Sequence, residues 1–364
     1  MSDNKKQNKP NVPNLRFPEF SGEWCLRRLE ECAVFLDDQR KPIKSSDRIN
    51  KMGLYPYYGA SGEIDRVDDF IFDDNLVLLS EDGANIIDRN YRVAFIINGK
   101  TWVNNHAHVL KPKQDIDLDF LSESLERLDY APYNTGTTMP KLNQEICRNI
   151  KISVPSYKEQ KKIGYLLSLL NNRIAIQSKV IEKYESLIKA LSYEIIGNKK
   201  PNSTLADCVK CSSSTLKEGD LLDEGLVPAY GASGLSGYSD RSQSNGDSIL
   251  ITKDGSGVGS LRYVHGSHSF VGTLNSLTPK DGIYLPFIYY ALQHVKLDSY
   301  KTGQAIPHIY FKDYGKETIY CPPYVVQKQL ASGLELLEVK KDIETDVLLE
   351  LKFAKTYLLN NLFI

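Results

Sequence analysis

Two stretches of the chain repeat apolar residues at the seven-residue spacing of paired helices. In the first stretch the apolar residues fall at the two seam positions of successive heptads, namely Leu167, Leu170, Ile174, Ile181, Tyr184, Ile188 and Leu191. Gln177 is the polar exception. Two apolar positions per heptad are typical of a coiled-coil seam. Because Pro155 and a Ser156-x-x-Glu159 capping box stand just before this pattern, it predicts a long helix beginning there.

A second stretch, over 322–364, carries a less regular version of the same pattern. Its seam residues are Leu330, Leu334, Leu337, Val347, Leu351, Ala354 and Leu358. Lys341 and Lys355 fall at two positions where the heptad expects an apolar residue. Each helix has roughly 40 residues, or about 60 Å at 1.5 Å per residue. One small domain cannot bury such a stripe, so we expect the two helices to pair with each other. A homodimeric coiled coil and a purely structural spacer are the alternatives.

The chain also contains a long internal repeat. Residues 53–62 read Gly-Leu-Tyr-Pro-Tyr-Tyr-Gly-Ala-Ser-Gly, and residues 225–234 read Gly-Leu-Val-Pro-Ala-Tyr-Gly-Ala-Ser-Gly. Further on, Tyr133-Asn-Thr-Gly136 answers Tyr300-Lys-Thr-Gly303, and Pro155-Ser-Tyr157-x-x-Gln160 answers Pro322-Pro-Tyr324-x-x-Gln327. A unit of roughly 170 residues is too long for a solenoid repeat. The repeat therefore predicts two homologous globular domains, each followed by a long helix.

The body of each repeat is mixed in its secondary-structure signals. Val93–Ile97 and Trp102–Val109 are β-prone and flank Asn98-Gly99, the preferred two-residue turn of a β-hairpin. In the second repeat the predicted strands are 249–252 and 261–264. The segments 120–128 and 287–295 are predicted to be short helices.

These elements predict an α+β, mixed fold with a pseudo-twofold internal repeat. We expect an N-terminal tail over 1–22, a first globular domain over 23–153, a first long helix over 154–197, a second domain over 198–321 and a second long helix over 322–364. If the helices pair antiparallel, the domains lie at opposite ends of a rod. Two similar but non-identical domains at a fixed separation suit a bipartite, asymmetric DNA target, because half-site spacing follows protein geometry.

Composition limits the class of DNA reader and the compartment. The net charge is −1 and the pI about 6.6, which excludes a strongly basic protein that coats DNA through phosphate neutralisation alone. The six cysteines are scattered and indicate no disulfide framework. Residues 1–13 lack the apolar core of a signal peptide, and no stretch approaches 18 apolar residues. We therefore expect a cytoplasmic protein with no membrane segment.

Two short motifs resemble those of nucleotide-binding proteins and methyltransferases. Ala94-x-x-x-x-Gly99-Lys100-Thr101 fits a relaxed Walker A string, but its spacer is strand-like and a second strand follows, so we interpret it as part of the hairpin. Cys321-Pro-Pro-Tyr324 is similar to the Asn/Asp-Pro-Pro-Tyr loop of amino-methyltransferases. Cysteine is a poor acceptor for the target amine, so we expect no catalytic residues.

Two further motifs have the spacing of metal ligands. Cys208-x-x-Cys211 could form half a zinc site with His265 and His268. However, Cys208 aligns with Cys32 and Cys211 with Phe35, which indicates core positions. His106-x-His108 has Thr273 and Asn275 at the equivalent places. We therefore expect no metal.

The combined motifs carry a family resemblance that covers nearly the whole chain. They are 15–24 (Leu-Arg-Phe-Pro-Glu-Phe-Ser-Gly-Glu-Trp), Thr135-Gly-Thr-Thr-x-Pro140-Lys-Leu142, and Pro155-x-x-x-Glu-Gln160-x-x-Ile163 opening the long helix. Together they resemble the specificity subunit of Type I restriction–modification systems. The second repeat departs from the pattern, since Thr302-Gly-Gln-Ala-Ile-Pro-His308 replaces Thr135-Gly-Thr-Thr-Met-Pro-Lys141.

The resemblance implies a non-catalytic subunit with two target-recognition domains that bind double-stranded DNA. Each domain would read one half of a split site. The helices would set the half-site spacing and dock two methyltransferase (M) subunits, and through them the restriction (R) subunits. The chain itself would hold no cofactor, while S-adenosylmethionine and ATP with Mg²⁺ would bind to partner subunits.

Candidate DNA contacts follow from side-chain chemistry. Asn, Gln, Arg and Lys can pair with base edges, while Thr, Ser, Lys and backbone N–H groups bind phosphates. For the first domain we select Tyr57, Tyr58, Arg89, Arg92, Asn104, Asn105, Thr135, Thr137 and Lys141. For the second we select Tyr230, Lys253, Ser256, Arg262, His265, Lys301, Thr302 and His308. The alternative functions are a stand-alone DNA methyltransferase or nuclease, and a coiled-coil adaptor without a DNA role.

Overall fold

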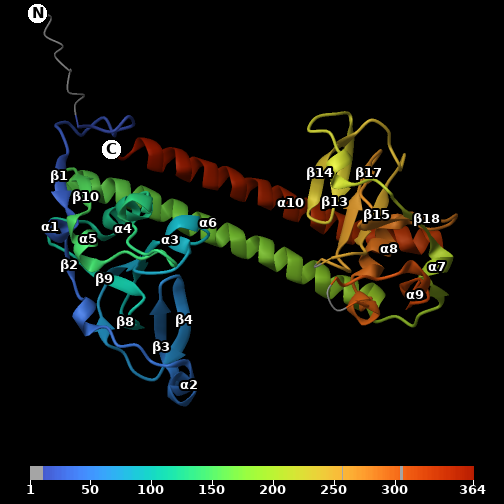
Figure 1. Ribbon diagram of the computed structural model, residues 1–364, viewed down its shortest axis with the longest axis horizontal. Coiled ribbons are helices and arrows are strands. Elements are labelled where there is room, and N and C mark those ends of the chain that lie inside the picture. Colours follow the sequence, from blue (N-terminus) through green and yellow to red (C-terminus); the bar gives the residue numbers. More distant parts are fainter. Residues whose placement is uncertain (1–10, 256, 304–305) are drawn as a thin grey trace, which may run out of the picture. The chain divides into compact units, whose positions relative to one another are not determined.

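Residues 11–255, 257–303 and 306–364 are described by the computed structural model, which divides into two units (Figure 1). Unit 1 runs to Gln177 and also includes Val347–Ile364, while unit 2 comprises Ser178–Asp346. Each unit therefore contains its own globular domain together with parts of both long helices.

The main sheet of unit 1 has the strand order β2-β9-β6-β7. Its inner strand β6 (Leu76–Ser80) is buried at every position. The reason is that a core lies on each face: Val77 and Leu79 belong to one apolar cluster, and Leu76 and Leu78 to another. The neighbouring strands are β2 (Ala33–Phe35), β9 (Ala107–Pro112) and β7 (Ala94–Ile97). The helices α1 (Leu29–Cys32), α4 (Leu118–Glu126) and α5 (Gln144–Asn149) contribute buried residues to the first cluster.

A second sheet of unit 1 has the order β4-β3-β8-β5. Its strands are β3 (Met52–Gly59), β4 (Gly62–Val67), β5 (Phe72–Asp73) and β8 (Lys100–Val103), with the short helices α2 (Ser45–Arg48) and α3 (Asn85–Asp88) elsewhere in the unit. β3 pairs parallel with β8, which places Tyr57 opposite Trp102. A separate antiparallel pair, β1 (Cys25–Arg28) with β10 (Lys151–Val154), joins the start of the domain to its end.

The hairpin predicted at Asn98-Gly99 is wrong. β7 pairs with β6, whereas β8 pairs with β3 and β5, so the two residues connect two sheets. Gly99 takes the positive φ expected of a turn, but its backbone N–H donates to the Asp74 carbonyl at 3.0 Å. The predicted strand 102–109 is also two strands, since β8 ends at Val103 and β9 begins at Ala107. Local turn chemistry favoured a hairpin, but burial of both strands against other partners prevails.

Unit 2 repeats this architecture. Its main sheet has the order β12-β18-β15-β16, and the second has β14-β13-β17. The strand bounds are β12 (Val209–Ser213), β13 (Val227–Gly231), β14 (Gly234–Ser239), β15 (Ser248–Thr252), β16 (Leu261–Val264), β17 (Ser269–Phe270) and β18 (Leu274–Pro279). The predicted strands at 249–252 and 261–264 are thereby confirmed as β15 and β16. β11 (Ser203–Thr204) pairs with β19 (Thr318–Ile319) as β1 does with β10.

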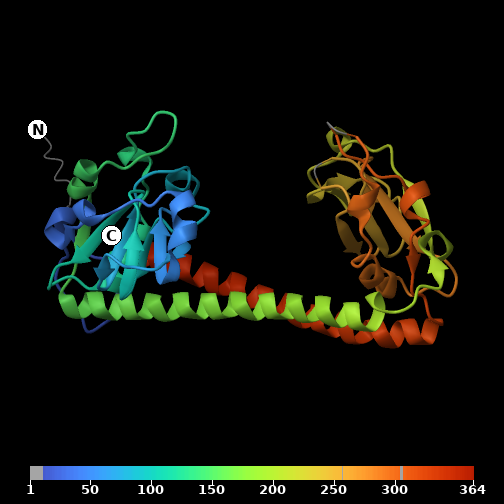
Figure 2. The ribbon, with the colours of Figure 1, turned by 90° about the horizontal axis from the view of Figure 1, so that it is seen from below.

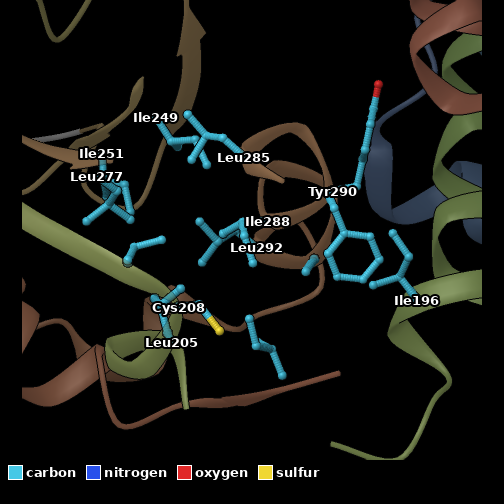
Figure 3. Close-up of a cluster of buried hydrophobic side chains, with 14 of the residues drawn as sticks. Ile196, Leu205, Cys208, Ile249, Ile251, Leu277, Leu285, Ile288, Tyr290 and Leu292 are labelled. Carbon is cyan, nitrogen blue, oxygen red and sulfur yellow. The ribbon is translucent and has the colours of Figure 1, made fainter. Parts of the chain in front are cut away.

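The main core of unit 2 lies between its main sheet, helix α8 and both long helices (Figure 3). Ile249 and Ile251 of β15 pack with Ile288 and Leu292 of α8 (Leu285–Leu292). The short helices α7 (Leu205–Cys208) and α9 (Phe311–Tyr314) close the same cluster. Both predicted short helices are confirmed, as α4 and α8, although each begins two residues earlier than predicted.

The long helices are α6 (Tyr157–Ser192), followed by a π-helical turn over Tyr193–Gly197, and α10 (Tyr324–Asn361). In unit 1 the start of α6 and the end of α10 meet: Ile163 and Leu167 share a cluster with Leu358 and Leu362. In Figure 2 the sheets of unit 1 stand on one side of this part of α6. In unit 2, Ile188 near the end of α6 shares a cluster with residues near the start of α10. Within each unit, the start of one helix meets the end of the other, as antiparallel pairing requires.

Most predicted seam residues are buried or half-buried, but three are exposed, namely Leu191, Val347 and Ala354. Leu191 is 38% exposed, and Ser192 is buried in its place, with Oγ 2.9 Å from Nε2 of His294. An α-helix drifts relative to a strict seven-residue repeat, and the seam therefore moves by one residue at this end. Val347 is 36% exposed and Leu348 is half-buried instead. The α10 seam thus runs through Lys341, Leu348, Lys355 and Leu362.

The predicted capping box forms only in part. The Ser156 hydroxyl accepts a hydrogen bond from the Glu159 backbone N–H at 3.4 Å. The Glu159 carboxylate, however, accepts two hydrogen bonds from the Arg16 guanidinium, each at 2.8 Å. The start of α6 is thereby tied to the N-terminal segment. Among the described residues, no helix is both long enough and apolar enough to cross a membrane.

Candidate functional site

Three loops of unit 1 are joined by hydrogen bonds between their backbones. They are residues 81–83, 104–106 and 134–141, which we call loop cluster 1. The Gly83 N–H donates to the Pro140 carbonyl at 3.0 Å, and the Glu81 N–H donates to the His106 carbonyl at 2.9 Å. These bonds bring together residues that are far apart in the sequence. Several of the predicted DNA contacts lie in this cluster.

The shape of loop 134–141 is set by its own polar groups. The Asn134 side-chain oxygen accepts from the backbone N–H groups of Gly136 and Lys141, both at 2.9 Å. The Thr135 N–H and hydroxyl both donate to the Lys141 carbonyl, at 2.9 Å and 3.1 Å. A Cβ on Gly136 would lie 1.8 Å from the Met139 carbonyl oxygen, so only glycine fits there. The loop is therefore a defined turn.

Unit 2 contains an equivalent loop cluster 2, formed by residues 253–255, 301–303 and 306–308. The Gly255 N–H donates to the Pro307 carbonyl at 2.9 Å, as Gly83 does to Pro140. The Thr302 N–H and hydroxyl donate to the His308 carbonyl at 2.9 Å and 3.2 Å. Thr135 makes the same pair of bonds in unit 1. The sequence repeat is thus also a repeat of hydrogen bonds.

The Gly-Ala-Ser-Gly segments are the turns between β3 and β4 and between β13 and β14. Gly62 and Gly234 both have positive φ, of 126° and 132°, which explains the conserved spacing of glycine within the repeat. Tyr58 and Tyr230, just before these turns, are half-buried, and each accepts a backbone hydrogen bond, from Asn104 and Val271. The hydroxyl-bearing ring of Tyr58 packs against Phe95.

Four predicted contact residues of unit 1 are exposed on loop cluster 1: Asn105, Thr135, Thr137 and Lys141. The Lys141 amino group lies 3.5 Å from the Glu81 carboxylate, which also binds Arg40 at 2.6 Å. The acidic groups behind the loops are therefore neutralised locally. All four residues are exposed, although Thr135 and Lys141 also bond within the cluster, and their DNA role stays a prediction.

Arg89 and Arg92 are held by α4. Arg89 Nη2 lies 3.4 Å from Glu126, and its guanidinium also sits over the ring of Tyr130. Arg92 Nη2 lies 2.5 Å from the Glu123 carboxylate, which is almost fully buried. Their ion pairs connect α4 to the segment before β7. In this arrangement both arginines stabilise the internal structure of unit 1.

Tyr57 and Asn104 are corrections to the predicted site. Tyr57 is 1% exposed, packs with Val67 and Trp102, and accepts a hydrogen bond from the Ile43 N–H. Asn104 is 5% exposed, and its side-chain oxygen accepts from the His106 N–H. Each lies on the inner face of its strand or loop, so neither side chain is at the surface where a DNA contact was predicted. Sequence pattern alone did not reveal which face would be buried.

In unit 2 the predicted residues divide into two places. Lys253, Lys301, Thr302 and His308 lie in loop cluster 2, where Lys301 is exposed and 2.6 Å from Asp298. Lys253 is 2.6 Å from Asp254. Ser256 lies outside the described residues.

Arg262 and His265 lie elsewhere, on and just after β16. Arg262 is exposed, and a Cβ on Gly234 would lie 3.3 Å from its Nη2. His265 is highly exposed and lies 3.1 Å from Asp247. Within the described part of the chain, no hydrogen bond or ion pair joins either residue to loop cluster 2.

Sequence reasoning missed Asn134 and His108, which hold loop cluster 1 in place. His108 Nδ1 lies 2.7 Å from Asp37, and Nε2 lies 2.8 Å from the Leu142 carbonyl. The Asn-x-Gly spacing at 134–136 was a usable signal for a side chain that caps a turn. His108 carried no such signal, because both its partners are distant in sequence.

The exposed groups of both loop clusters include hydroxyls, amides and lysines beside the apolar side chains of Met139 and Ile306. Such groups bind phosphate oxygens and base edges. In the part of the chain that the structure describes, no cluster of three or more His, Cys, Asp or Glu residues is placed to hold a metal ion. The arrangement suits recognition of a polyanion.

Comparison with known proteins agrees with the duplicated fold. The sequence pattern of the family described as "Type I restriction modification DNA specificity domain" matches residues 21–186 and again residues 201–352. A putative type I restriction enzyme specificity subunit of Haemophilus influenzae is 34% identical over 148 residues, which cover 41% of this chain and 37% of that protein. The MjaVIII specificity subunit of Methanocaldococcus jannaschii is 27% identical over 191 residues, covering 49% and 42%. The chain thus matches about two fifths of the length of each relative.

A solved structure shares the fold over almost the whole chain. The crystal structure of the Type I restriction–modification system S subunit from M. genitalium superimposes with a TM-score of 0.73 at 20% identity, covering 97% of this chain and 99% of that one. At this identity the likeness establishes the fold. The family pattern, matched twice along most of the sequence, establishes the family. The chain is therefore a member of the Type I restriction–modification DNA specificity family and carries two copies of its domain.

Proposed function

We propose that the chain is the specificity subunit of a Type I restriction–modification complex, in which each domain reads one half of a bipartite, asymmetric DNA site. One observation carries the proposal. The same loop cluster is built twice with the same hydrogen bonds, yet it presents different exposed side chains. Asn105, Thr137 and Lys141 are exposed in unit 1, and Lys301 and Ile306 in unit 2. Two loop clusters with the same backbone hydrogen bonds but different exposed side chains are suited to bind two different half-sites.

In this proposal the chain recognises and positions DNA, and its partners perform the chemistry. Two methyltransferase subunits dock on the long helices and bind S-adenosylmethionine, and restriction subunits join through them with ATP and Mg²⁺. The rigid length of α6 and α10 sets the spacing between half-sites. The complex acts in the cytoplasm, where the DNA is.

A domain exchange combined with methylation mapping tests the proposal. Residues 23–153 are replaced by the corresponding domain of another family member, and methylated sites are mapped across the genome with the native, exchanged and deleted gene. We expect deletion to abolish one class of methylated site and the exchange to alter only one half of its sequence. A change in both halves, or in neither, would contradict the assignment of one domain to one half-site.

A second measurement separates recognition from catalysis. The purified chain is incubated with DNA and labelled S-adenosylmethionine, alone and with the methyltransferase subunit. We expect transfer only in the presence of the partner. Transfer by the chain alone would identify it as a methyltransferase in its own right.

A further inference from the structure

Unit 2 contains a cavity of about 430 Å³ next to α8 and the first half of α10. We call it the tyrosine pocket. Its walls include Tyr263, Tyr289, Tyr290, Glu335, Glu338 and Asp342. None of these residues belongs to loop cluster 2. The pocket is thus a separate feature of the domain.

The aromatic walls meet at steep angles. The rings of Tyr263 and Tyr289 have centroids 5.7 Å apart and planes inclined by 80°, and those of Tyr289 and Tyr290 are 5.7 Å apart at 62°. Rings inclined in this way offer a guest both faces and edges. The electron-rich face of a tyrosine attracts a cation when solvent is excluded.

The hydroxyl group of Tyr290 makes no hydrogen bond to another described residue. The residue is only 3% exposed and lines the pocket. In Figure 3 its hydroxyl points away from the aliphatic side chains of the core. This group is therefore placed to bind a guest in the pocket.

The charged groups around the pocket are mainly acidic. Glu335 accepts a hydrogen bond from the Tyr284 hydroxyl at 3.1 Å, and no cation pairs with Glu335 or Asp342 within the described residues. Glu338 forms an ion pair with Lys341.

A further acidic group lies close to His265, which also lines the pocket. Asp247 lies 3.1 Å from the His265 ring and accepts from the Tyr263 hydroxyl at 3.0 Å. Arg262 is the other basic group close to the tyrosines. Lys341 pairs with Glu338 and His265 lies beside Asp247, so Glu335 and Asp342 are the two carboxylates without an ion-pair partner among the described residues. A site of this charge repels phosphate and favours a cation.

Unit 1 fills the equivalent place with its own cations. Glu123 stands where unit 2 has Tyr290, and it binds Arg92 at 2.5 Å, Asn171 at 2.8 Å and Lys355 at 3.6 Å. At the positions that correspond to Arg92 and Lys355 in the repeat, unit 2 has Gly259 and Ile188. The same site is therefore closed by internal basic side chains in one domain and open in the other.

We propose that the tyrosine pocket binds an arginine side chain of a partner protein. A planar guanidinium can stack on the tyrosine rings while its N–H groups donate to the Tyr290 oxygen and to Glu335 or Asp342. This geometry reproduces the role of Arg92 in unit 1. The inference rests on the proposed function in one respect, because the partner is taken to be another subunit of the same complex. The pocket would distinguish the two ends of an otherwise duplicated protein.

The experiment uses the full chain and N-acetyl-L-arginine amide as the probe. Tyrosine ring signals are followed by NMR at low ionic strength as the probe is added. We expect saturable shifts with a dissociation constant on the order of 1–10 mM, the range for a single side chain. The citrulline analogue, which has the same shape without the charge, should give no saturation.

Two variants make the result specific to the pocket. The double variant Glu335→Gln with Asp342→Asn should weaken probe binding at least tenfold. Glu350→Gln, which changes an exposed carboxylate elsewhere on α10, should leave binding unchanged. Absence of saturation, equal binding of the citrulline analogue, or an unaffected double variant would each overturn the inference. The methylation map tests the proposed function independently of these titrations, so the two can fail separately.

Discussion

Nδ1 of His108 lies 2.7 Å from a carboxylate oxygen of Asp37, and both side chains are buried. The other ring nitrogen lies 2.8 Å from the Leu142 carbonyl oxygen. Both partners are acceptors, so the ring must donate from both nitrogens, which only the protonated imidazole can do. Burial alone would lower the pKa of His108, but the hydrogen bonds to Asp37 and Cys147 outweigh it and raise the pKa to about 10.

This pair makes the stability of unit 1 depend on pH. The pKa of His108 is raised on folding, so its contribution is complete below its unfolded pKa near 6.5 and is lost as pH rises through about 10. His108→Gln should lower the free energy of unfolding by about 3 kcal/mol at pH 6.5, and by progressively less at higher pH. Both tryptophans, Trp24 and Trp102, lie in unit 1, so their fluorescence during urea unfolding reports this unit.

The control for this prediction is His265→Gln, because His265 is exposed and belongs to unit 2. It should leave the tryptophan transition unchanged at every pH. A stability difference between native chain and His108→Gln that stayed constant from pH 6.5 to above 10 would show that His108 is not charged.

Gln160 connects the start of α6 to the domain body of unit 1. Its side-chain oxygen accepts from the Asp117 N–H at 3.0 Å, and its Nε2 donates to the carbonyls of Pro155 and Asp115. Gln160→Leu removes all three bonds and should cost roughly 3 kcal/mol, measured by tryptophan fluorescence in urea. Gln114→Leu, at an exposed position, should cost less than about 0.5 kcal/mol. Equal effects of the two changes would sink the prediction.

The burial of Ile188 and the exposure of Leu191 distinguish the observed helix seam from the seam that a strict heptad repeat predicts. Ile188 is 4% exposed in the core of unit 2, whereas Leu191 is 38% exposed. Ile188→Ala should destabilise unit 2 by about 2–4 kcal/mol. Leu191→Ala should change stability by less than about 1 kcal/mol. Hydrogen exchange of the α8 peptide under native conditions measures both, and a larger effect at Leu191 would restore the expected register.

A substitution at Thr137 should weaken DNA binding without changing stability. A substitution at Tyr57 should lower stability without changing DNA binding. Thr137 is exposed on loop cluster 1, so Thr137→Ala should reduce the affinity of the assembled complex for its site about fivefold, near 1 kcal/mol, without changing the tryptophan transition. Tyr57→Phe removes a buried hydroxyl that bonds to Ile43 and should cost about 1 kcal/mol of stability with no change in affinity. Affinity is measured by DNA titration at fixed salt. Reduced affinity in Tyr57→Phe at full stability would return that residue to the contact surface.

The duplication and the long helices could be predicted because their signals extend over many residues. The repeat at Gly53 and Gly225 and the seam through Ile174 and Ile181 are each supported by many positions spread along the sequence. The Asn98-Gly99 hairpin failed because a two-residue signal competes with the burial of whole strands. The free energy that a two-residue turn preference contributes is smaller than the free energy gained when whole strands are buried in the core.

The contact surface was harder to predict than the fold. Tyr57 and Asn105 both carry groups that can hydrogen-bond to DNA, yet Tyr57 packs with Trp102 and Asn105 is exposed. Which of them faces outward depends on pairings between strands far apart in the chain. The closed site at Glu123 and the open pocket at Tyr290 also depend on Arg92 and Lys355, which come from different segments.

Unit 1 is assembled from two separate stretches of the polypeptide, since Leu362 and Phe363 complete the cluster around Trp24 and Phe120. During translation the ribosome makes Trp24 early and Phe363 only after every residue of unit 2. Until then the apolar surface around Trp24 lacks the part of its cover that Leu362 and Phe363 provide. The half of the protein that is synthesised first is therefore the half that matures last, and a nascent chain stalled before residue 347 would leave that surface open to chaperones or proteases.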